Sequence, residues 1–242
     1  MESITVKNLS KNYGKVCALD GVSLKIERGE LFGLLGVNGA GKTTLIKILS
    51  GLTKKTSGEA FVEGYSVDGE MDEIKKIIDV SPQETAVAPN LTVEENFGFF
   101  AEVYGQNDFE YIEELKEKFG LSEVAKRRAK TLSGGWKRRL SVALALVPKP
   151  KIVFLDEPTL GMDVIARREL WKIIRDLKGK ATIILTSHYL EETEALCDRA
   201  AIMAKGKVLA VGTIDEIKKG TGESSFEDAF VKIVGEKSGY ED

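Results

Sequence analysis

Residues 36–43, Gly-Val-Asn-Gly-Ala-Gly-Lys-Thr, have the types and spacing needed to hold phosphate groups. They fit the pattern G-x-x-x-x-G-K-[ST], in which glycines let successive backbone N–H groups turn toward one anion. Lys42 would reach the β- and γ-phosphates of a nucleotide, and the Thr43 hydroxyl would bind Mg²⁺. The alternative is a chance glycine turn containing Lys-Thr, which average residue frequencies allow in roughly one chain in a hundred of this length. The stretch therefore predicts a site for nucleotide phosphates.

Charged and titratable side chains follow two apolar runs further along the chain. Asp156 and Glu157 come directly after residues 152–155, and His188, the single histidine, follows shortly after residues 181–185. Because α/β sheets bind ligands at the carboxyl ends of their strands, these side chains are predicted to meet at one edge. Near a phosphate loop, Asp156 would hold Mg²⁺ through water and Glu157 would accept a proton from attacking water. The alternatives are a carboxylate pair that caps the next segment and a structural histidine, but the positions at strand ends favour a functional role.

A second possible anion site lies at Ser133-Gly134-Gly135, ahead of an apolar-rich helical stretch. Small residues, free N–H groups and the positive end of a helix dipole favour a bound anion there. The basic residues 137–139 that follow oppose the dipole, and a bound phosphate would relieve that conflict. The alternative is a capped helix with an exposed basic first turn.

Two further residues are weak signals when taken alone. Gln83 follows an apolar stretch, where a polar residue is usually a solvated loop residue. Tyr13 lies in a polar segment beside Gly14, between the first two expected strands, and suits a surface turn. An aromatic ring next to a nucleotide site can instead stack on adenine.

Apolar patterns indicate the elements that must position these residues. Residues 31–35 form a buried strand and residues 45–52 repeat at helical spacing, so the glycine loop has the strand–loop–helix context that it needs. Alternation at residues 4–9 and 22–26 predicts half-buried strands. Three helical patterns without a strand predict a helical insert in an α/β core; they cover residues 92–104, with a capping box at Thr92 and Glu95, 108–119 and 121–129. The expected elements after residue 190 are a hairpin at 200–211, short helices at 214–219 and 226–234, and a frayed polar tail at 235–242.

Composition describes an ordinary globular chain. The 242 residues are 43% hydrophobic and 30% charged, with a net charge of −3, so net charge does not indicate nucleic-acid binding. The two cysteines lack metal-type spacing, and the N-terminus lacks the pattern of a signal peptide. The longest apolar runs are far shorter than the ~20 residues of a membrane span. We therefore expect a cytoplasmic protein that another subunit would have to hold at a membrane.

Taken in order, these motifs closely resemble the ATP-binding subunit of an ABC transporter over about residues 2–220. The resemblance implies a P-loop NTPase (RecA-like) core at 1–84 and 151–220 with an antiparallel β-subdomain, an inserted α-helical subdomain at 85–150, and a short C-terminal helix and tail at 221–242. It assigns roles residue by residue: adenine stacking to Tyr13; phosphate binding to Asn38, Gly39, Ala40, Gly41, Lys42, Thr43 and Thr44; Mg²⁺ to Thr43, Gln83 and Asp156; catalysis to Glu157, His188, Lys42 and Gln83; the signature loop, which acts on a partner's ATP, to Ser133, Gly134 and Gly135; and a dimer-crossing loop to Asp163.

The resemblance also implies partners and a location. It implies a head-to-tail homo- or heterodimer that clamps ATP and Mg²⁺, bound to integral membrane permease subunits on the inner face of the cell membrane, with no nucleic acid. Trp136 departs from the family, which usually has Gln after Leu-Ser-Gly-Gly, while the turn at residues 160–163 looks like that of ABC-2 exporters.

Two rival functions stay open at this point. The first is a soluble ABC-type ATPase that acts on DNA or on ribosomes. The type that acts on DNA carries a long coiled coil between the two loops, but here only about fifty residues without sustained heptads separate Gln83 and Ser133. The type that acts on ribosomes carries two ATP-binding domains in one chain, whereas this sequence shows one. The second is a regulatory protein that binds ATP without hydrolysing it. The presence of Glu157 and His188, the residues to which the resemblance assigns catalysis, argues against this function.

Overall fold

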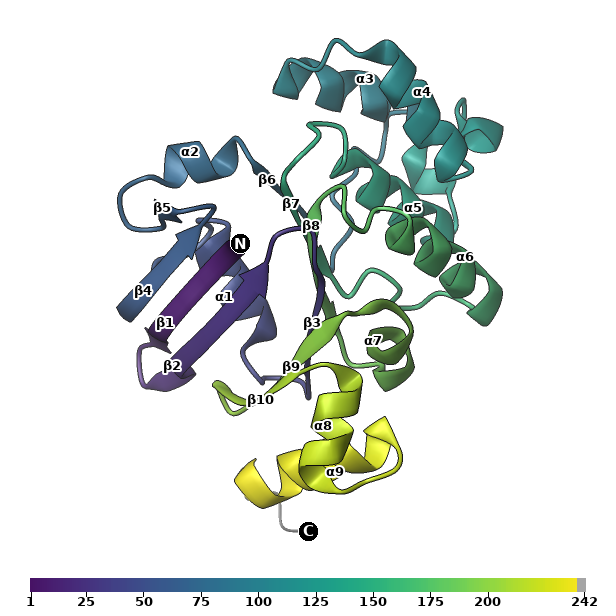
Figure 1. The fold of residues 1–242 in the computed structure, drawn as a ribbon. Coiled ribbons are helices and arrows are strands. Elements are labelled where there is room, and N and C mark those ends of the chain that lie inside the picture. The colour runs from purple at the N-terminus through teal and green to yellow at the C-terminus, as the bar shows by residue number, and fades with distance from the viewer. Residues whose placement is uncertain (239–242) are drawn as a thin grey trace.

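Two β-sheets organise the chain in the computed structural model, which describes residues 1–238 (Figure 1). The smaller sheet is antiparallel, with strand order β2-β1-β4-β5. Its strands are β1 (Glu2–Tyr13), β2 (Val16–Glu27), β4 (Ser57–Val62) and β5 (Tyr65–Ser66). The larger sheet has the order β10-β9-β3-β8-β7-β6. Its strands are β3 (Leu31–Gly36), β6 (Ile78–Ser81), β7 (Ile152–Asp156), β8 (Thr182–Ser187), β9 (Arg199–Ala204) and β10 (Lys207–Gly212).

The larger sheet is parallel except for β10, which runs antiparallel to β9. Every residue of β3, β7 and β8 is buried, which explains why these strands are mainly apolar and do not alternate between apolar and polar residues. Since β3, β7 and β8 are adjacent and parallel, their carboxyl ends share one edge of the sheet. That edge brings together the start of the glycine loop, Asp156 and the segment before His188.

The predicted helical insert is present between β6 and β7. It contains α3 (Val93–Tyr104), α4 (Phe109–Lys118) and α5 (Gly134–Leu144); in Figure 1, α3 and α4 lie at the top and α5 lies below them. The predicted capping box is confirmed, because Thr92 accepts from the Glu95 amide and Glu95 accepts from the Thr92 amide. The remaining helices are α1 (Lys42–Leu49), α2 (Met71–Lys75), α6 (Val164–Arg175), α7 (Leu190–Leu196), α8 (Ile214–Thr221) and α9 (Phe226–Ser238).

The prediction of a helix over residues 121–129 was wrong. The segment forms two short 3₁₀ turns, η1 (Leu121–Val124) and η2 (Ala129–Thr131). The carbonyls of Ala125 and Arg127 accept hydrogen bonds from the first amides of α3, at 3.0 Å each. These carbonyls therefore accept from the free N–H groups at the start of α3, and they are not used for the hydrogen bonds of a helix over residues 121–129.

The polar tail was also predicted wrongly in part, because α9 continues through residue 235 to Ser238. Buried Phe226, Ile233 and Val234 hold this helix in an apolar cluster with β9 and α8. Residues 239–242 of the predicted tail lie outside the described residues. Between residues 1 and 238, no helix combines the length and apolarity needed to span a bilayer. The division into core and helical subdomain at residues 85 and 150 stays a prediction.

Candidate functional site

The glycine loop lies between β3 and α1 at the shared edge of the larger sheet. A Cβ atom on Gly36 would lie 2.3 Å from the Met203 carbonyl oxygen, so only glycine fits there. Gly41, directly before α1, has φ +104°, a backbone conformation that side chains rarely adopt. Both glycines are therefore required by the geometry of the loop, which aims its amides and the N-terminus of α1 at one place.

The Lys42 side chain folds back over this loop. Its Nζ donates to the carbonyls of Gly36 (2.6 Å) and Val37 (3.3 Å), and the residue is 6% exposed. Burial lowers the pKa of Lys42, and the nearby charges of Glu157 and Asp156 partly oppose that shift. The ammonium group is thus held at the loop, poised for a negatively charged ligand.

The loop is supported from a distant part of the chain that the sequence did not point to. The Gly206 amide, in the turn between β9 and β10, donates to the Ala40 carbonyl at 3.1 Å. In turn, the Gly206 carbonyl accepts from the Asp20 amide at 2.9 Å. The hairpin at 200–211 was predicted, but its contact with the phosphate loop depends on β9 pairing beside β3.

Asp156, at the end of β7, is buried among oxygen-bearing side chains. Its Oδ2 lies 3.2 Å from the Thr43 hydroxyl, and its Oδ1 accepts from the Thr186 hydroxyl at 2.5 Å. A carboxylate and a hydroxyl side by side are hard oxygen donors of the kind that Mg²⁺ takes, with water and phosphate oxygens completing the octahedron. The donors present therefore fit the Mg²⁺ role predicted for Thr43 and Asp156. Thr186 was not singled out in the sequence, where it reads only as a strand end.

Glu157 has a left-handed backbone, with φ +50°, and its amide donates to the Thr186 hydroxyl at 2.9 Å. This conformation aims the carboxylate between two of the predicted site residues. Gln83 Nε2 donates to Glu157 Oε2 at 3.3 Å, and His188 Nδ1 lies 3.2 Å from Glu157 Oε1. A non-glycine residue held at positive φ by surrounding contacts is typical of functional sites.

A pocket of about 510 Å³ opens above the glycine loop. Gln83 and Glu157 line one part of it, and Tyr13 lines another. Tyr13 is 46% exposed and its ring faces the Lys11 ammonium at 4.6 Å. It is the last residue of β1, directly before the turn at Gly14, so it is a surface aromatic beside a turn glycine, as predicted. The pocket thus collects most of the predicted nucleotide residues: Tyr13, Asn38, Gly39, Ala40, Gly41, Lys42, Thr43, Thr44, Gln83 and Glu157.

The predicted residues of the signature loop and the dimer-crossing loop lie in a separate pocket of about 400 Å³ that shares no lining residue with the first. It contains Ser133, Gly134, Gly135 and Asp163, together with Met162 and Trp136. The Ser133 side chain makes no capping hydrogen bond to α5, and its hydroxyl finds no hydrogen-bond partner among residues 1–238. Asp163 has a structural role as well, because its carboxylate caps α6 through the amides of Ile165 and Ala166.

The basic residues after the signature loop are mostly bound within the chain. Arg138 is buried and donates to the Pro82 carbonyl at 3.0 Å, while Arg139 pairs with Glu169. The Arg139 guanidinium also lies 5.1 Å from the Trp136 ring centroid. The positive charges of Arg138 and Arg139 are therefore stabilised by acceptors within the chain. The basic residues 137–139 do not by themselves indicate a bound phosphate.

The chain is similar to one protein family and to several known proteins. The family described as "ABC transporter" matches residues 19–160, more than half of the chain. The linearmycin resistance ATP-binding protein LnrL of Bacillus subtilis is 42% identical over 214 residues, covering 87% of this chain and 69% of that protein. The doxorubicin resistance ATP-binding protein DrrA of Mycobacterium tuberculosis is 41% identical over 239 residues, covering 96% of this chain and 70% of that protein. A solved ATP-binding subunit of an ABC transporter superposes with a TM-score of 0.86 at 30% identity, covering 96% of this chain and 99% of that one.

Proposed function

Because this chain belongs to the ABC transporter family of ATP-binding ATPases, we propose that two copies, or one copy and a similar partner chain, clamp ATP between them to drive transport through membrane subunits. The carrying observation is the separation of the two pockets. One holds the phosphate loop and the catalytic carboxylate, whereas the other offers a free serine hydroxyl at a helix N-terminus without a phosphate loop. Each pocket supplies what the other lacks, so a head-to-tail pair would form two complete sites.

The proposed chemistry is in-line attack of water on the γ-phosphate of ATP. Glu157 would orient the water and take its proton at a carboxylate oxygen, and Gln83 and His188 would hold that carboxylate from either side. Lys42 would exchange the carbonyls of Gly36 and Val37 for phosphate oxygens. Mg²⁺ held at Thr43, Asp156 and Gln83 would neutralise charge on the transferred phosphoryl group.

Dimer closure and opening would follow from charge. ATP carries several negative charges, and the two apposed N-termini, at α1 of one chain and α5 of the other, are both positive ends of helix dipoles. The nucleotide would therefore hold the two faces together, and hydrolysis with loss of phosphate would remove the link.

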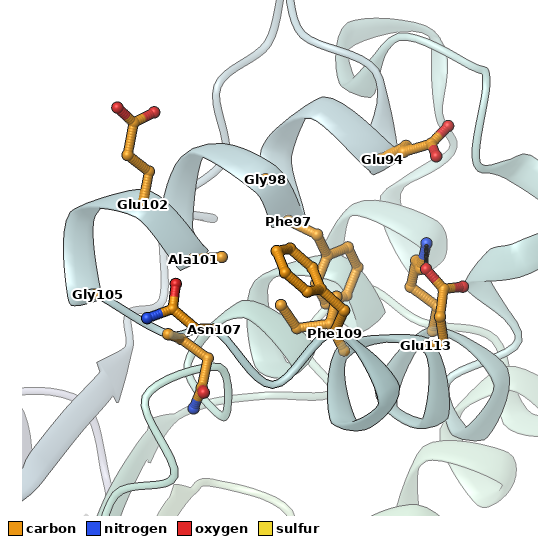
Figure 2. A pocket seen from close by; sticks show the side chains of 12 residues that line it. Glu94, Phe97, Gly98, Ala101, Glu102, Gly105, Asn107, Phe109 and Glu113 are labelled. Atoms are coloured by element: carbon orange, nitrogen blue, oxygen red, sulfur yellow. Dashed lines mark ion pairs between the residues drawn. The ribbon is translucent and has the colours of Figure 1, made fainter.

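The helical insert offers a surface for the membrane subunits at the inner face of the membrane. A groove of about 430 Å³ runs between α3 and α4, and Figure 2 shows Phe97 and Phe109 within it. Phe109 is 71% exposed, and Glu94, Glu102 and Glu113 line the same groove. An apolar floor with acidic residues around it suits an amphipathic segment with basic residues. A movement of the membrane subunits would then be transmitted through the helical insert to Gln83.

The test is the Glu157→Gln variant. The amide cannot take a proton from water but preserves the size of the side chain, so ATP binding should persist and turnover should stop. Size-exclusion chromatography with light scattering should show a monomer without nucleotide and a dimer with Mg-ATP. A variant that stays monomeric at saturating Mg-ATP, or that hydrolyses ATP at the wild-type rate, would contradict the proposal. Lys42→Met in the same background is the control, because it should abolish the ATP-dependent dimer.

A further inference from the structure

One face of α5 is tied to the end of β6 at two points. Ser141 and Arg138 are three residues apart and so lie on the same helix face. The Ser141 hydroxyl is hydrogen bonded to the Ser81 hydroxyl at 3.1 Å, and both serines are buried. Arg138 Nη1 donates to the Pro82 carbonyl at 3.0 Å. The two ties end at the two residues before Gln83, so α5 is bound to the segment that leads into Gln83.

Arg138 is an unusual residue to find at this junction. It is 6% exposed, and the Pro82 carbonyl is the hydrogen-bond acceptor found for its side chain within the described residues. Burial lowers the pKa of Arg138, and the charges of Glu157 and Asp156 oppose that shift. The guanidinium therefore lies within electrostatic reach of both carboxylates of the nucleotide site while belonging to the helix that starts at the signature loop.

We propose that Arg138 is a positioning residue that transmits the state of the signature loop to Gln83 and Glu157 of the same chain. The inference rests on the proposed function, in which the ATP at Ser133 is held by the partner chain. Arg138 is five residues along α5 from Ser133, roughly 7 Å at the rise of an α-helix. When a phosphate at the N-terminus of α5 shifts this helix, Pro82 moves with it and Gln83, the next residue, changes its contact with Glu157. Each active site thus reports the nucleotide bound across the interface.

The experiment compares hydrogen–deuterium exchange of two segments in the Glu157→Gln background, with and without Mg-ATP. In that background, residues 133–138 and residues 81–86 should both exchange more slowly when Mg-ATP forms the dimer. Adding Arg138→Met, which keeps bulk and removes the donor, should preserve the slowing at 133–138 and lose most of it at 81–86. The matched control is Arg168→Met, an exposed arginine on α6, which should leave both segments as in the background.

A kinetic arm uses the intact Glu157 enzyme. Arg138→Met should lower kcat about tenfold or more, the size expected for losing one charge-assisted hydrogen bond that is needed in the transition state, with ATP affinity within about twofold. Arg138→Lys, which can still donate to the Pro82 carbonyl, should recover part of the loss. If Arg138 only supported the fold, Arg138→Met would lower the free energy of unfolding, and hydrogen–deuterium exchange would change alike at residues 133–138 and 81–86.

The outcomes are distinct. If Arg138→Met keeps full Mg-ATP protection at residues 81–86 in a dimer, the coupling is refuted while the proposed function stands. If Glu157→Gln never forms a dimer with Mg-ATP, the proposed function fails and this inference fails with it. Should Arg138→Met not fold, Arg138→Gln, whose side chain is shorter and uncharged, takes its place, and full Mg-ATP protection at 81–86 in that variant would also overturn the proposal.

Discussion

Thr186 links the carboxylate of Asp156, the predicted Mg²⁺ ligand, to the backbone amide of Glu157, the predicted base. Replacing this threonine with valine removes the hydroxyl with little change in the shape of the side chain. The hydroxyl donates to Asp156 Oδ1 at 2.5 Å and accepts from the Glu157 amide at 2.9 Å, and the residue is 0% exposed. Thr186→Val would remove the short hydrogen bond to Asp156 Oδ1, leaving that oxygen the longer contact with the Thr43 hydroxyl at 3.4 Å, and would remove one of the two acceptors of the Glu157 amide. A hydrogen bond to a charged group and a neutral one together predict a loss of about 2–4 kcal/mol in the free energy of unfolding.

The same change should impair catalysis, because Asp156 and Glu157 lose the contact that fixes them relative to each other. Misplacement of catalytic groups by about 1 Å can cost about 100-fold, so we expect kcat/KM for ATP hydrolysis to fall about 10- to 100-fold. Steady-state ATPase assays and urea unfolding measure the two effects separately. Thr186→Ser, which keeps the hydroxyl, should recover most of the activity.

A matched control lies on the same strand. Thr182 is also buried, and its hydroxyl accepts from the Gly29 amide at 3.0 Å and donates to Ser3 at 3.2 Å, at the opposite end of β8. Thr182→Val should lower stability by about 1–3 kcal/mol and leave kcat/KM within about twofold. If Thr186→Val loses similar stability but keeps wild-type kcat/KM, Thr186 only packs and our account of the carboxylate pair is wrong.

Three further predictions concern charge and packing. Lys42→Met should weaken ATP binding at least about tenfold, measured with a fluorescent ATP analogue, without lowering the free energy of unfolding, because burial already disfavours the ammonium form. Burial raises the pKa of Asp79 to about 6, above its ordinary 3.8, so the folded state binds this proton more tightly and stability is lost as pH rises from about 4 through 6. Asp79→Asn should therefore raise the free energy of unfolding by about 2–3 kcal/mol at pH 8, and the gain should vanish near pH 4; a pH-independent gain would contradict this assignment. Trp136→Gln should cost about 1–2 kcal/mol in denaturant unfolding, since the ring packs on the helical core and faces Arg139, yet the Glu157→Gln dimer should still form with Mg-ATP.

The sequence alone determined the parts of the molecule that depend on neighbours in the chain. The glycine loop, its preceding strand and its following helix are contiguous, so residue types and apolar spacing were enough to predict them. The strand ends before Glu157 and His188 were predicted because mainly apolar runs mark the buried strands of a parallel sheet. The predicted fold class, which rests on the same apolar patterns and on the family resemblance, was confirmed. The roles of the individual site residues stay predictions.

The local sequence pattern did not predict the secondary structure correctly where a segment makes contacts with a distant element. Residues 121–129 have helical spacing, but two of their carbonyls cap α3 instead of continuing a helix. Residues 235–238 look like a polar tail, but the apolar residues before them hold the helix against β9 and α8. In both places tertiary contacts outweighed the local preference, which amounts to only a fraction of a kcal/mol per residue.

Only the tertiary structure decided how the site is assembled. Gln83 and Glu157 are 74 residues apart in sequence and meet because β6 and β7 are neighbours, and Gly206 reaches the phosphate loop because β9 lies beside β3. The pocket at Ser133 is separate from the pocket at the glycine loop, as the family resemblance implied, and the placing of α5 in the fold sets this separation. Backbone preferences act over one or two turns of chain, whereas these contacts depend on strand order and on which buried polar atoms find partners.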